Sequence, residues 1–236
     1  PGRTAARRRG ARGPRRGGRA PDLDDDEVLP WIGRFLARLH QVGAQRPFVS
    51  RPALDWQTFG KDCRDDIMNS PLLPLQVQTE WLAATDAALA IVATHPLLGN
   101  FPLDLAPPQR LRTHGDCHLG NILWTPSGIS GAGPHFVDLD DARMSVAVQD
   151  VWMLLEGDRA HRSFQLSCIL EGYEQIRRFD RHELALIEPL RTLRLIHYSA
   201  WLTKRWHDPS FPIHFPWFGT VDYWREQTQQ TIKHAA

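Results

Sequence analysis

At 236 residues the chain can form one large domain or two small ones, and its 42% apolar content is enough for a substantial core. Eight of the 28 lysines and arginines fall in the first 20 residues, which hold no acid, so 20 basic side chains face 27 acidic ones in the rest. This balance argues against a nucleic-acid-binding surface on the folded part. Three cysteines without a CxxC pair argue against a disulfide framework and favour a reducing cytoplasm.

The N-terminal segment 1–20 is a low-complexity run of Arg, Gly, Ala and Pro, which predicts a disordered tail. An arginine-rich arm for nucleic acid is the alternative, and salt-sensitive binding that vanished without these residues would support it. We favour the solvated tail and expect no nucleic-acid partner. Residues 21–236 are then the folded domain, and the acidic run 22–27 would cap its first helix.

Helical periodicity predicts a first helix over 28–41, with one apolar stripe that tolerates Pro30 in the first turn. The chain between 42 and 75 has weak periodicity. The apolar stretch 81–93 contains Thr85 and Asp86, so it predicts no membrane span and no membrane partner. Further helices are expected at 78–93, 146–155, 163–178, 181–206 (interrupted near Pro189) and 222–234.

Two short apolar runs, at 121–124 and 135–139, predict a pair of strands. The ten residues between them are TPSGISGAGP, which is typical turn chemistry. The pattern therefore predicts a β-hairpin with a long loop.

Residues 114–123, HGDCHLGNIL, gather side chains that suit three different chemistries. A zinc site is poorly supported, because His114, Cys117 and His118 lack the usual paired-ligand spacing. A nucleophilic Cys117 would need a base oriented by a third group, so we interpret it as a packed thiol. The third possibility, a kinase catalytic loop, has the pattern H-x-D with an asparagine five residues after the aspartate.

His114, Asp116 and Asn121 have that kinase spacing. A carboxylate can take the proton of a substrate hydroxyl, and an amide oxygen can coordinate magnesium without adding charge. A second carboxylate should follow a hairpin, and Asp138 does so. The alternative is a local hydrogen-bonded loop followed by a solvated strand end.

HGDCHLGNIL followed by FVDLDDA resembles the aminoglycoside phosphotransferase and choline kinase-like branch of the protein-kinase fold. DVWMLLEGD, LIEPLR, IHYSAWL and FPWFGT are similar to bacterial stress-response serine/threonine protein kinases within it. The resemblance implies a cytoplasmic enzyme that uses ATP and Mg²⁺ to phosphorylate a serine or threonine hydroxyl of a protein. Asp116 would be the proton acceptor in the catalytic loop 114–123, and Asn121 and Asp138 would bind magnesium and nucleotide.

The metal-binding segment would be 136–142, in which Asp138 is also counted as catalytic. Asp140 and Asp141 are less certain: Asp140 would share a face with Asp138 if the strand continued, and otherwise would only shape the loop. Asp150 resembles an aspartate that braces the catalytic loop from below, with His114 as a second supporting residue. An ordinary helix charge is the equally weighted interpretation of Asp150.

Two departures stand out from this family pattern. The loop between the motifs is long, and we expect a surface excursion. No glycine-rich phosphate loop or strand lysine is present, since the only lysines are Lys61, Lys204 and Lys233.

We therefore expect an α+β protein-kinase-like fold that is mainly the helical C-terminal lobe with a small hairpin and no N-terminal lobe. Such a chain would be a monomer that binds ATP weakly and transfers phosphate poorly by itself. A small-molecule kinase and a non-catalytic single-lobe binding module remain alternatives.

Overall fold

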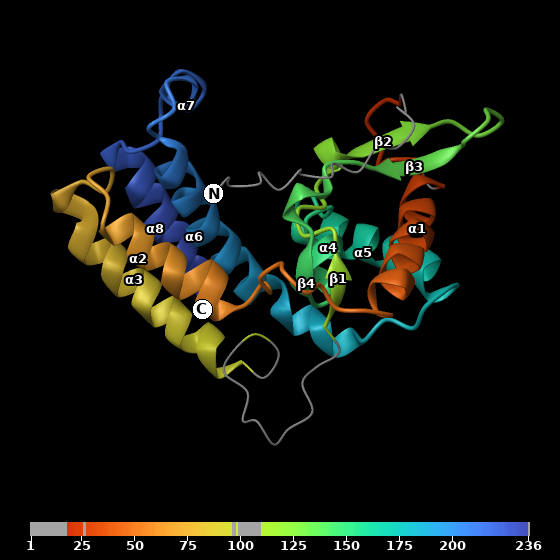
Figure 1. Ribbon diagram of the computed structural model, residues 1–236. Coiled ribbons are helices and arrows are strands. Elements are labelled where there is room, and N and C mark those ends of the chain that lie inside the picture. Colours follow the sequence, from red (N-terminus) through yellow and green to blue (C-terminus); the bar gives the residue numbers. More distant parts are fainter. Residues whose placement is uncertain (1–17, 26, 96–97, 99–109, 236) are drawn as a thin grey trace, which may run out of the picture.

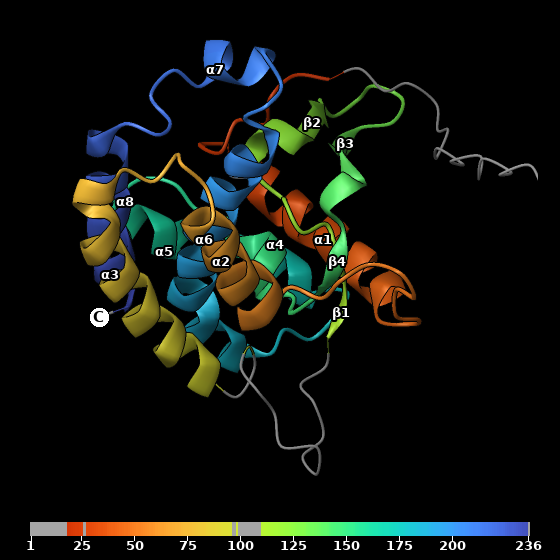
Figure 2. The ribbon, with the colours of Figure 1, turned by 60° about the vertical axis from the view of Figure 1, so that its left-hand side comes forward.

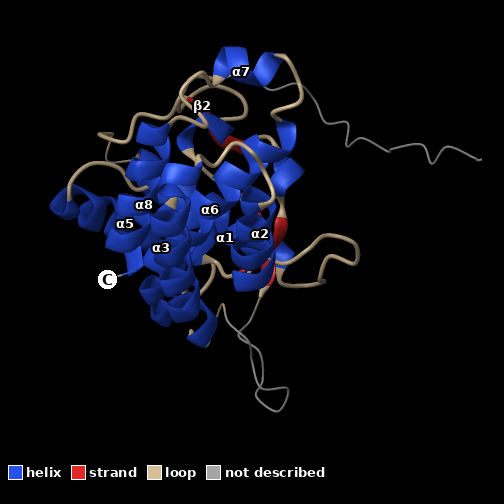
Figure 3. Cartoon of the chain, turned by 90° about the vertical axis from the view of Figure 1, so that its left-hand side faces the viewer, coloured by secondary structure: helices blue, strands red, loops and turns tan. Residues whose placement is uncertain are grey.

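The structure is a computed structural model that describes residues 18–25, 27–95, 98 and 110–235. Helices dominate these residues and strands are short (Figure 3). The helices are α1 (Val28–Gly43), α2 (Asp62–Met68), α3 (Leu75–Thr94), α4 (Val148–Trp152), α5 (Arg159–Glu174), α6 (Ile187–Arg205), α7 (Ser210–His214) and α8 (Val221–Ala235). The strands are β1 (Leu111–Thr113), β2 (Ile122–Thr125), β3 (Gly133–Phe136) and β4 (Arg143–Ser145).

The helices form two groups, and the long α6 runs between them (Figure 1). In the first group α3 packs on α8, and α6 packs on both α2 and α8. Two fully buried tryptophans, Trp81 of α3 and Trp224 of α8, meet edge to face with ring centroids 5.5 Å apart. Trp81 also donates its indole N–H to Gln227 at 2.5 Å. Within the described residues, no helix combines the length and apolarity that a membrane crossing needs.

The second group packs α1 against α5, and glycines set how closely they approach. A Cβ on Gly33 of α1 would lie 2.0 Å from the carbonyl oxygen of Ile169, and one on Gly172 of α5 would lie 2.0 Å from that of Pro30. The predicted apolar stripe of α1 is confirmed in part: Val28, Ile32 and Leu36 are buried, whereas its other members, Trp31, Phe35 and Leu39, are only partly buried. His40 continues the stripe at helical spacing after Ile32 and Leu36 and is fully buried.

The strands form two antiparallel pairs on the same side of the helical body (Figures 1 and 2). The predicted hairpin is confirmed as β2–β3, with Ile122 opposite Phe136 and Thr125 opposite Gly133. Its second strand ends at Phe136, before the predicted end at 139. Asp138 and Asp140 therefore lie beyond the strand, and the condition for their sharing one strand face is not met. The β1–β4 pair was not predicted, and it places the start of the catalytic loop beside the segment that follows Asp138.

Most predicted helices are confirmed with shifted ends. Within the weakly periodic stretch 42–75, the chain forms a π-helix, η1 (Trp56–Lys61), that leads into α2. The predicted interruption near Pro189 lies slightly earlier, where the 3₁₀ segment η4 (Arg181–Leu186) gives way to α6. Pro189 sits in the first turn of α6, where a missing N–H does no harm.

The predicted disordered tail 1–20 falls mostly outside the described residues. At Arg19 the prediction does not hold, because the backbone N–H of Arg19 donates to Trp124 and that of Trp124 donates back, at 3.1 and 2.7 Å. The chain at this point adds an isolated antiparallel bridge to the edge of β2.

Candidate active site

The predicted catalytic loop leaves β1 and enters β2 through the 3₁₀ turn η2 (Leu119–Asn121). Local hydrogen bonds fold it tightly. The backbone carbonyl of Asp116 accepts the amide N–H of His118 at 3.0 Å and the side-chain Nδ2 of Asn121 at 2.9 Å. Asp116 and Asn121 are therefore fixed relative to each other by a direct contact.

Asp150 anchors this loop from below. One carboxylate oxygen accepts the backbone N–H of His114 at 2.7 Å, and the other accepts that of Gly115 at 2.9 Å. Gln149, its neighbour on α4, donates to the carbonyl oxygen of Gly115 at 3.0 Å. These contacts support the bracing interpretation of Asp150 over that of an ordinary helix charge, because the side chain is fully buried.

The anchor is itself held by two residues that the sequence did not point to. His40 of α1 places Nε2 2.9 Å from the Asp150 carboxylate, and its Nδ1 lies 2.9 Å from the Tyr173 hydroxyl. His40 and Tyr173 are both fully buried, and burial raises the pKa of the Tyr173 phenol above its usual range. The hydroxyl therefore stays protonated in this network. The α1–α5 packing thus supports the catalytic loop.

Asp116 lies at the surface end of the loop, with its side chain 17% exposed. One carboxylate oxygen is 2.7 Å from Nη2 of Arg194 on α6, an ion pair that joins the loop to the other helical group. The second oxygen is 3.6 Å from Nε2 of His118, too far for a hydrogen bond. His118 accepts the Gly120 N–H at its Nδ1, so the neutral ring carries its proton on Nε2 and turns it toward Asp116.

Asn121 and Asp138 come together because the hairpin closes between them. The N–H of Val137 donates to the carbonyl oxygen of Asn121 at 3.0 Å. Asp138 is the next residue after Val137, so this hydrogen bond holds it near Asn121. Asp138 is exposed and has φ 58° and ψ 65°, a left-handed conformation that is unusual for a non-glycine residue. Such conformations cluster at functional sites, where surrounding structure enforces them.

The donor set at this point fits a hard cation. The amide nitrogen of Asn121 is used by Asp116, which leaves its carbonyl oxygen as the remaining ligand atom. Among the described residues, the Asp138 carboxylate makes no hydrogen bond or ion pair. An amide oxygen and a carboxylate are oxygen ligands of the kind Mg²⁺ prefers. Asp141, in contrast, is paired with Arg143 at 2.9 Å.

His114 ties the two motifs to each other. Its Nε2 donates to the carbonyl oxygen of Val137 at 2.8 Å, directly before Asp138. Gly115 lets the backbones approach, because it has φ +86° and a Cβ there would lie 2.2 Å from the carbonyl oxygen of Asp141. Both residues therefore bring the catalytic loop against the segment 136–142.

The competing chemistries find little support in this geometry. Cys117 is fully buried, and burial raises the pKa of its thiol well above the usual value, which disfavours a thiolate nucleophile. No group of three or more His, Cys, Asp or Glu side chains suited to a metal ion occurs in the part of the chain that the structure describes.

The sequence analysis missed the residues that reach the site from distant segments: His40, Tyr173 and Arg194. His40 had one detectable signal, since it continues the buried i, i+4 stripe of α1 as a polar residue. Arg194 and Tyr173 stand in helical segments whose periodicity does not reveal a long-range partner.

Comparison with known proteins places the chain in a family. The sequence matches the Phosphotransferase enzyme family over residues 3–187, and the chain therefore belongs to that family. Stress response kinase A of Salmonella choleraesuis is 45% identical over 217 residues, and that of Escherichia coli is 43% identical over 219. The Serine/threonine protein kinase RdoA of Salmonella typhimurium is 44% identical over 217 residues.

These alignments cover 92% or 93% of the chain and 62% of each relative, so the chain spans less than two thirds of the relatives' length. Among solved structures, amicoumacin kinase hAmiN in complex with AMP-PNP, Ca²⁺ and Ami has a TM-score of 0.61 at 18% identity, covering 95% of this chain and 63% of that one. A choline/ethanolamine kinase family protein from Mesorhizobium loti has a TM-score of 0.55 at 14% identity, covering 93% and 71%. The predicted kinase-like α+β fold is shared with these proteins.

Proposed function

We propose that the chain carries the catalytic loop and the metal-binding segment of an ATP-dependent kinase that phosphorylates serine or threonine hydroxyls of proteins in a bacterial stress response. The observation that carries the proposal is the meeting of the two motifs: Asn121 contacts Asp116, and the hairpin delivers Asp138 beside Asn121. A phosphoryl-transfer site needs a carboxylate for the hydroxyl and oxygen ligands for magnesium within one small region.

In this proposal Asp116 accepts the proton of the substrate hydroxyl. Neither carboxylate oxygen makes a hydrogen bond among the described residues: one is ion-paired with Arg194 at 2.7 Å, and the other faces His118 at 3.6 Å. The ion pair fixes the carboxylate, so one oxygen is oriented for a hydroxyl before substrate arrives.

Asn121 and Asp138 would hold Mg²⁺, which neutralises phosphate charge when it is bound. The ATP phosphates would lie against the same segment, 136–142.

The protein substrate is supported by the sequence relatives. The curated relatives at 43–45% identity are named stress response kinase A or serine/threonine protein kinase RdoA. The small-molecule kinases are similar in structure at only 14–18% identity, a level that reflects the shared fold. We therefore favour a protein hydroxyl over an aminoglycoside or choline. A cytoplasmic location and a monomeric state stay predictions.

The test is transfer of labelled γ-phosphate from ATP to a mixed bacterial protein fraction, followed by phosphoamino acid analysis. We expect slow, Mg²⁺-dependent labelling of serine and threonine that Asp116→Asn reduces by about a hundredfold or more. Asp24→Asn is the matched control, because Asp24 is exposed and its side chain has no partner among the described residues. Labelling that survives Asp116→Asn contradicts the proposal, and so does wild-type labelling no faster than that of the variant.

A further inference from the structure

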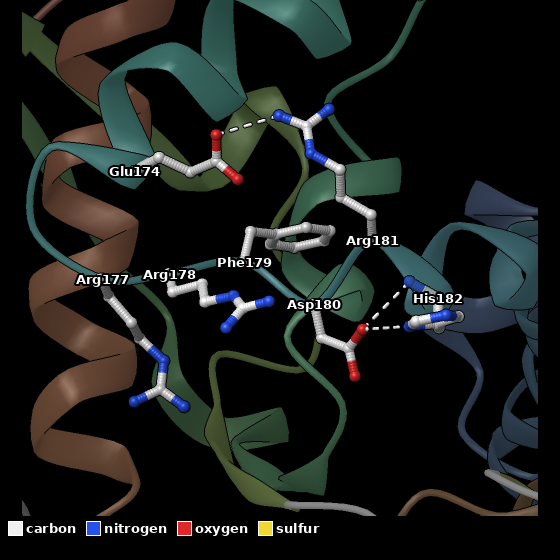
Figure 4. Close-up of a pocket in the computed structure, with 7 residues that line it drawn as sticks. All are labelled: Glu174, Arg177, Arg178, Phe179, Asp180, Arg181 and His182. Carbon is white, nitrogen blue, oxygen red and sulfur yellow. Dashed lines mark hydrogen bonds and ion pairs between the residues drawn. The ribbon is translucent and has the colours of Figure 1, made fainter.

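A cavity of ≈ 720 Å³ lies where the end of α5 meets η4, away from the catalytic motifs (Figure 4). Its volume falls in the range of small-molecule sites, roughly 300–1,000 Å³. No residue of the catalytic loop or of segment 136–142 lines it. The lining residues are Glu174, Arg177, Arg178, Phe179, Asp180, Arg181 and His182.

The cavity has an excess of positive charge. Its two acids are already engaged: Glu174 pairs with Arg181 at 2.9 Å, and Asp180 accepts both the backbone N–H and the ring Nδ1 of His182 at 3.0 and 2.9 Å. Arg178 is exposed and makes no hydrogen bond or ion pair within the described residues, although its charge acts on Asp180. Its guanidinium therefore remains available to an anion.

The arginines stand on a fixed backbone. Phe179, between Arg178 and Asp180, is 3% exposed and meets Tyr173 edge to face at 5.5 Å. Asp180 caps η4 through the His182 N–H. The segment 177–182 is thus pinned at its centre and at its end. Its arginines line the cavity in different directions: Arg181 turns toward Glu174, and Arg177 points the opposite way (Figure 4).

The cavity also backs onto the supports of the catalytic loop. Tyr173, which packs against Phe179, holds His40 and through it Asp150. Glu183, the residue after His182, accepts the N–H of Val148 at the start of α4, the helix that carries Asp150. A ligand here would stabilise elements on which the catalytic loop rests.

We infer that this cavity binds a small molecule that bears a phosphate group. The planar guanidinium matches phosphate oxygens in a two-point contact, which makes arginine the residue of choice for such recognition. Arg178 would make such a contact, and Arg181, whose Nη2 is shared with Glu174, would add its remaining N–H groups. The volume leaves room for the rest of the ligand. This site is separate from the proposed catalytic site and does not depend on kinase activity.

Isothermal titration calorimetry of the 236-residue chain with inorganic pyrophosphate, in low salt without ATP or Mg²⁺, tests the inference. We expect saturable binding that Arg178→Gln and Arg181→Gln each weaken by about tenfold, since hydrogen bonds to a charged group are worth that much. Arg178→Lys keeps the charge but loses the two-point contact, so an intermediate loss is expected.

Arg225→Gln is the matched control, because Arg225 is exposed on α8 and its substitution removes the same charge as the cavity variants do. The Arg225→Gln chain should bind pyrophosphate as tightly as the unchanged chain does. The inference is overturned if pyrophosphate does not saturate, if both cavity variants bind as tightly as the unchanged chain, or if Arg225→Gln weakens binding as much as they do. Circular dichroism of each variant confirms that the comparison is made between folded proteins.

Discussion

Replacing Asp150 by asparagine should lower the stability of the fold, because it breaks hydrogen bonds that hold the loop 114–123. The carboxylate accepts the N–H groups of His114 and Gly115 on different oxygens, and His40 contacts one of the same oxygens. Asparagine offers a single oxygen, so its amide nitrogen must face one of the two backbone N–H groups. A buried donor left without an acceptor costs about 1–3 kcal/mol, and the remaining bonds weaken because the acceptor is no longer charged.

We expect a loss of roughly 2–4 kcal/mol in the free energy of unfolding, a large part of a typical domain's stability of about 5–15 kcal/mol. Urea unfolding followed by tryptophan fluorescence measures it, since the chain has 9 tryptophans, among them the buried Trp81 and Trp224. Asp24→Asn provides the control and should change stability by less than about 0.5 kcal/mol. If Asp150→Asn shifts the urea midpoint no more than the control does, the buried anchor is refuted.

Three further predictions follow from buried groups and close packing. Burial raises the pKa of Glu183 from 4.5 to about 7, so this side chain ionises at lower pH in the unfolded chain than in the folded one. The free energy of unfolding should therefore fall by roughly 3 kcal/mol as pH rises from about 4.5 to about 7. Glu183→Gln should remove this fall, and an unchanged pH profile in that variant would contradict the assignment. Burial also raises the pKa of Cys63 to about 11 and that of Cys117 well above its usual value. Iodoacetamide at pH 8 should therefore label Cys168, which is only partly buried, before the other two cysteines, and peptide mass mapping would show the order. Early labelling of Cys117 would be inconsistent with its burial. Gly172→Ala should lower the free energy of unfolding in urea by about 1–3 kcal/mol, because the added Cβ would lie 2.0 Å from the carbonyl oxygen of Pro30. An unaffected urea midpoint would show that α1 and α5 can separate at no cost.

The sequence was sufficient for those parts of the site that depend on local spacing. The hairpin follows from turn chemistry and periodicity, and it brings Asp138 next to Asn121. The catalytic role of the loop 114–123 rests on motif spacing and stays a prediction. The long helices were predictable for the same reason, because one buried face repeats along each of them.

The remainder depends on contacts between distant segments. The strands β1 and β4 have three residues each, too few to show an alternating pattern. The ion pair of Arg194 with Asp116 and the network from Tyr173 through His40 to Asp150 join residues that are far apart in the chain. The left-handed Asp138 was also unforeseen, since the local sequence favours a continued strand.

The proposed phosphoryl-transfer site requires that the two motifs form one metal site, which can be tested directly. Electron paramagnetic resonance with Mn²⁺ in place of Mg²⁺, in the presence of ATP, measures the bound ion without relying on turnover. We expect Asn121→Ala and Asp138→Asn each to weaken Mn²⁺ binding by about tenfold or more, whereas Asp24→Asn leaves it unchanged. Binding that is equally strong in all four proteins would show that Asn121 and Asp138 do not share a cation, and the proposed phosphoryl-transfer site would be wrong.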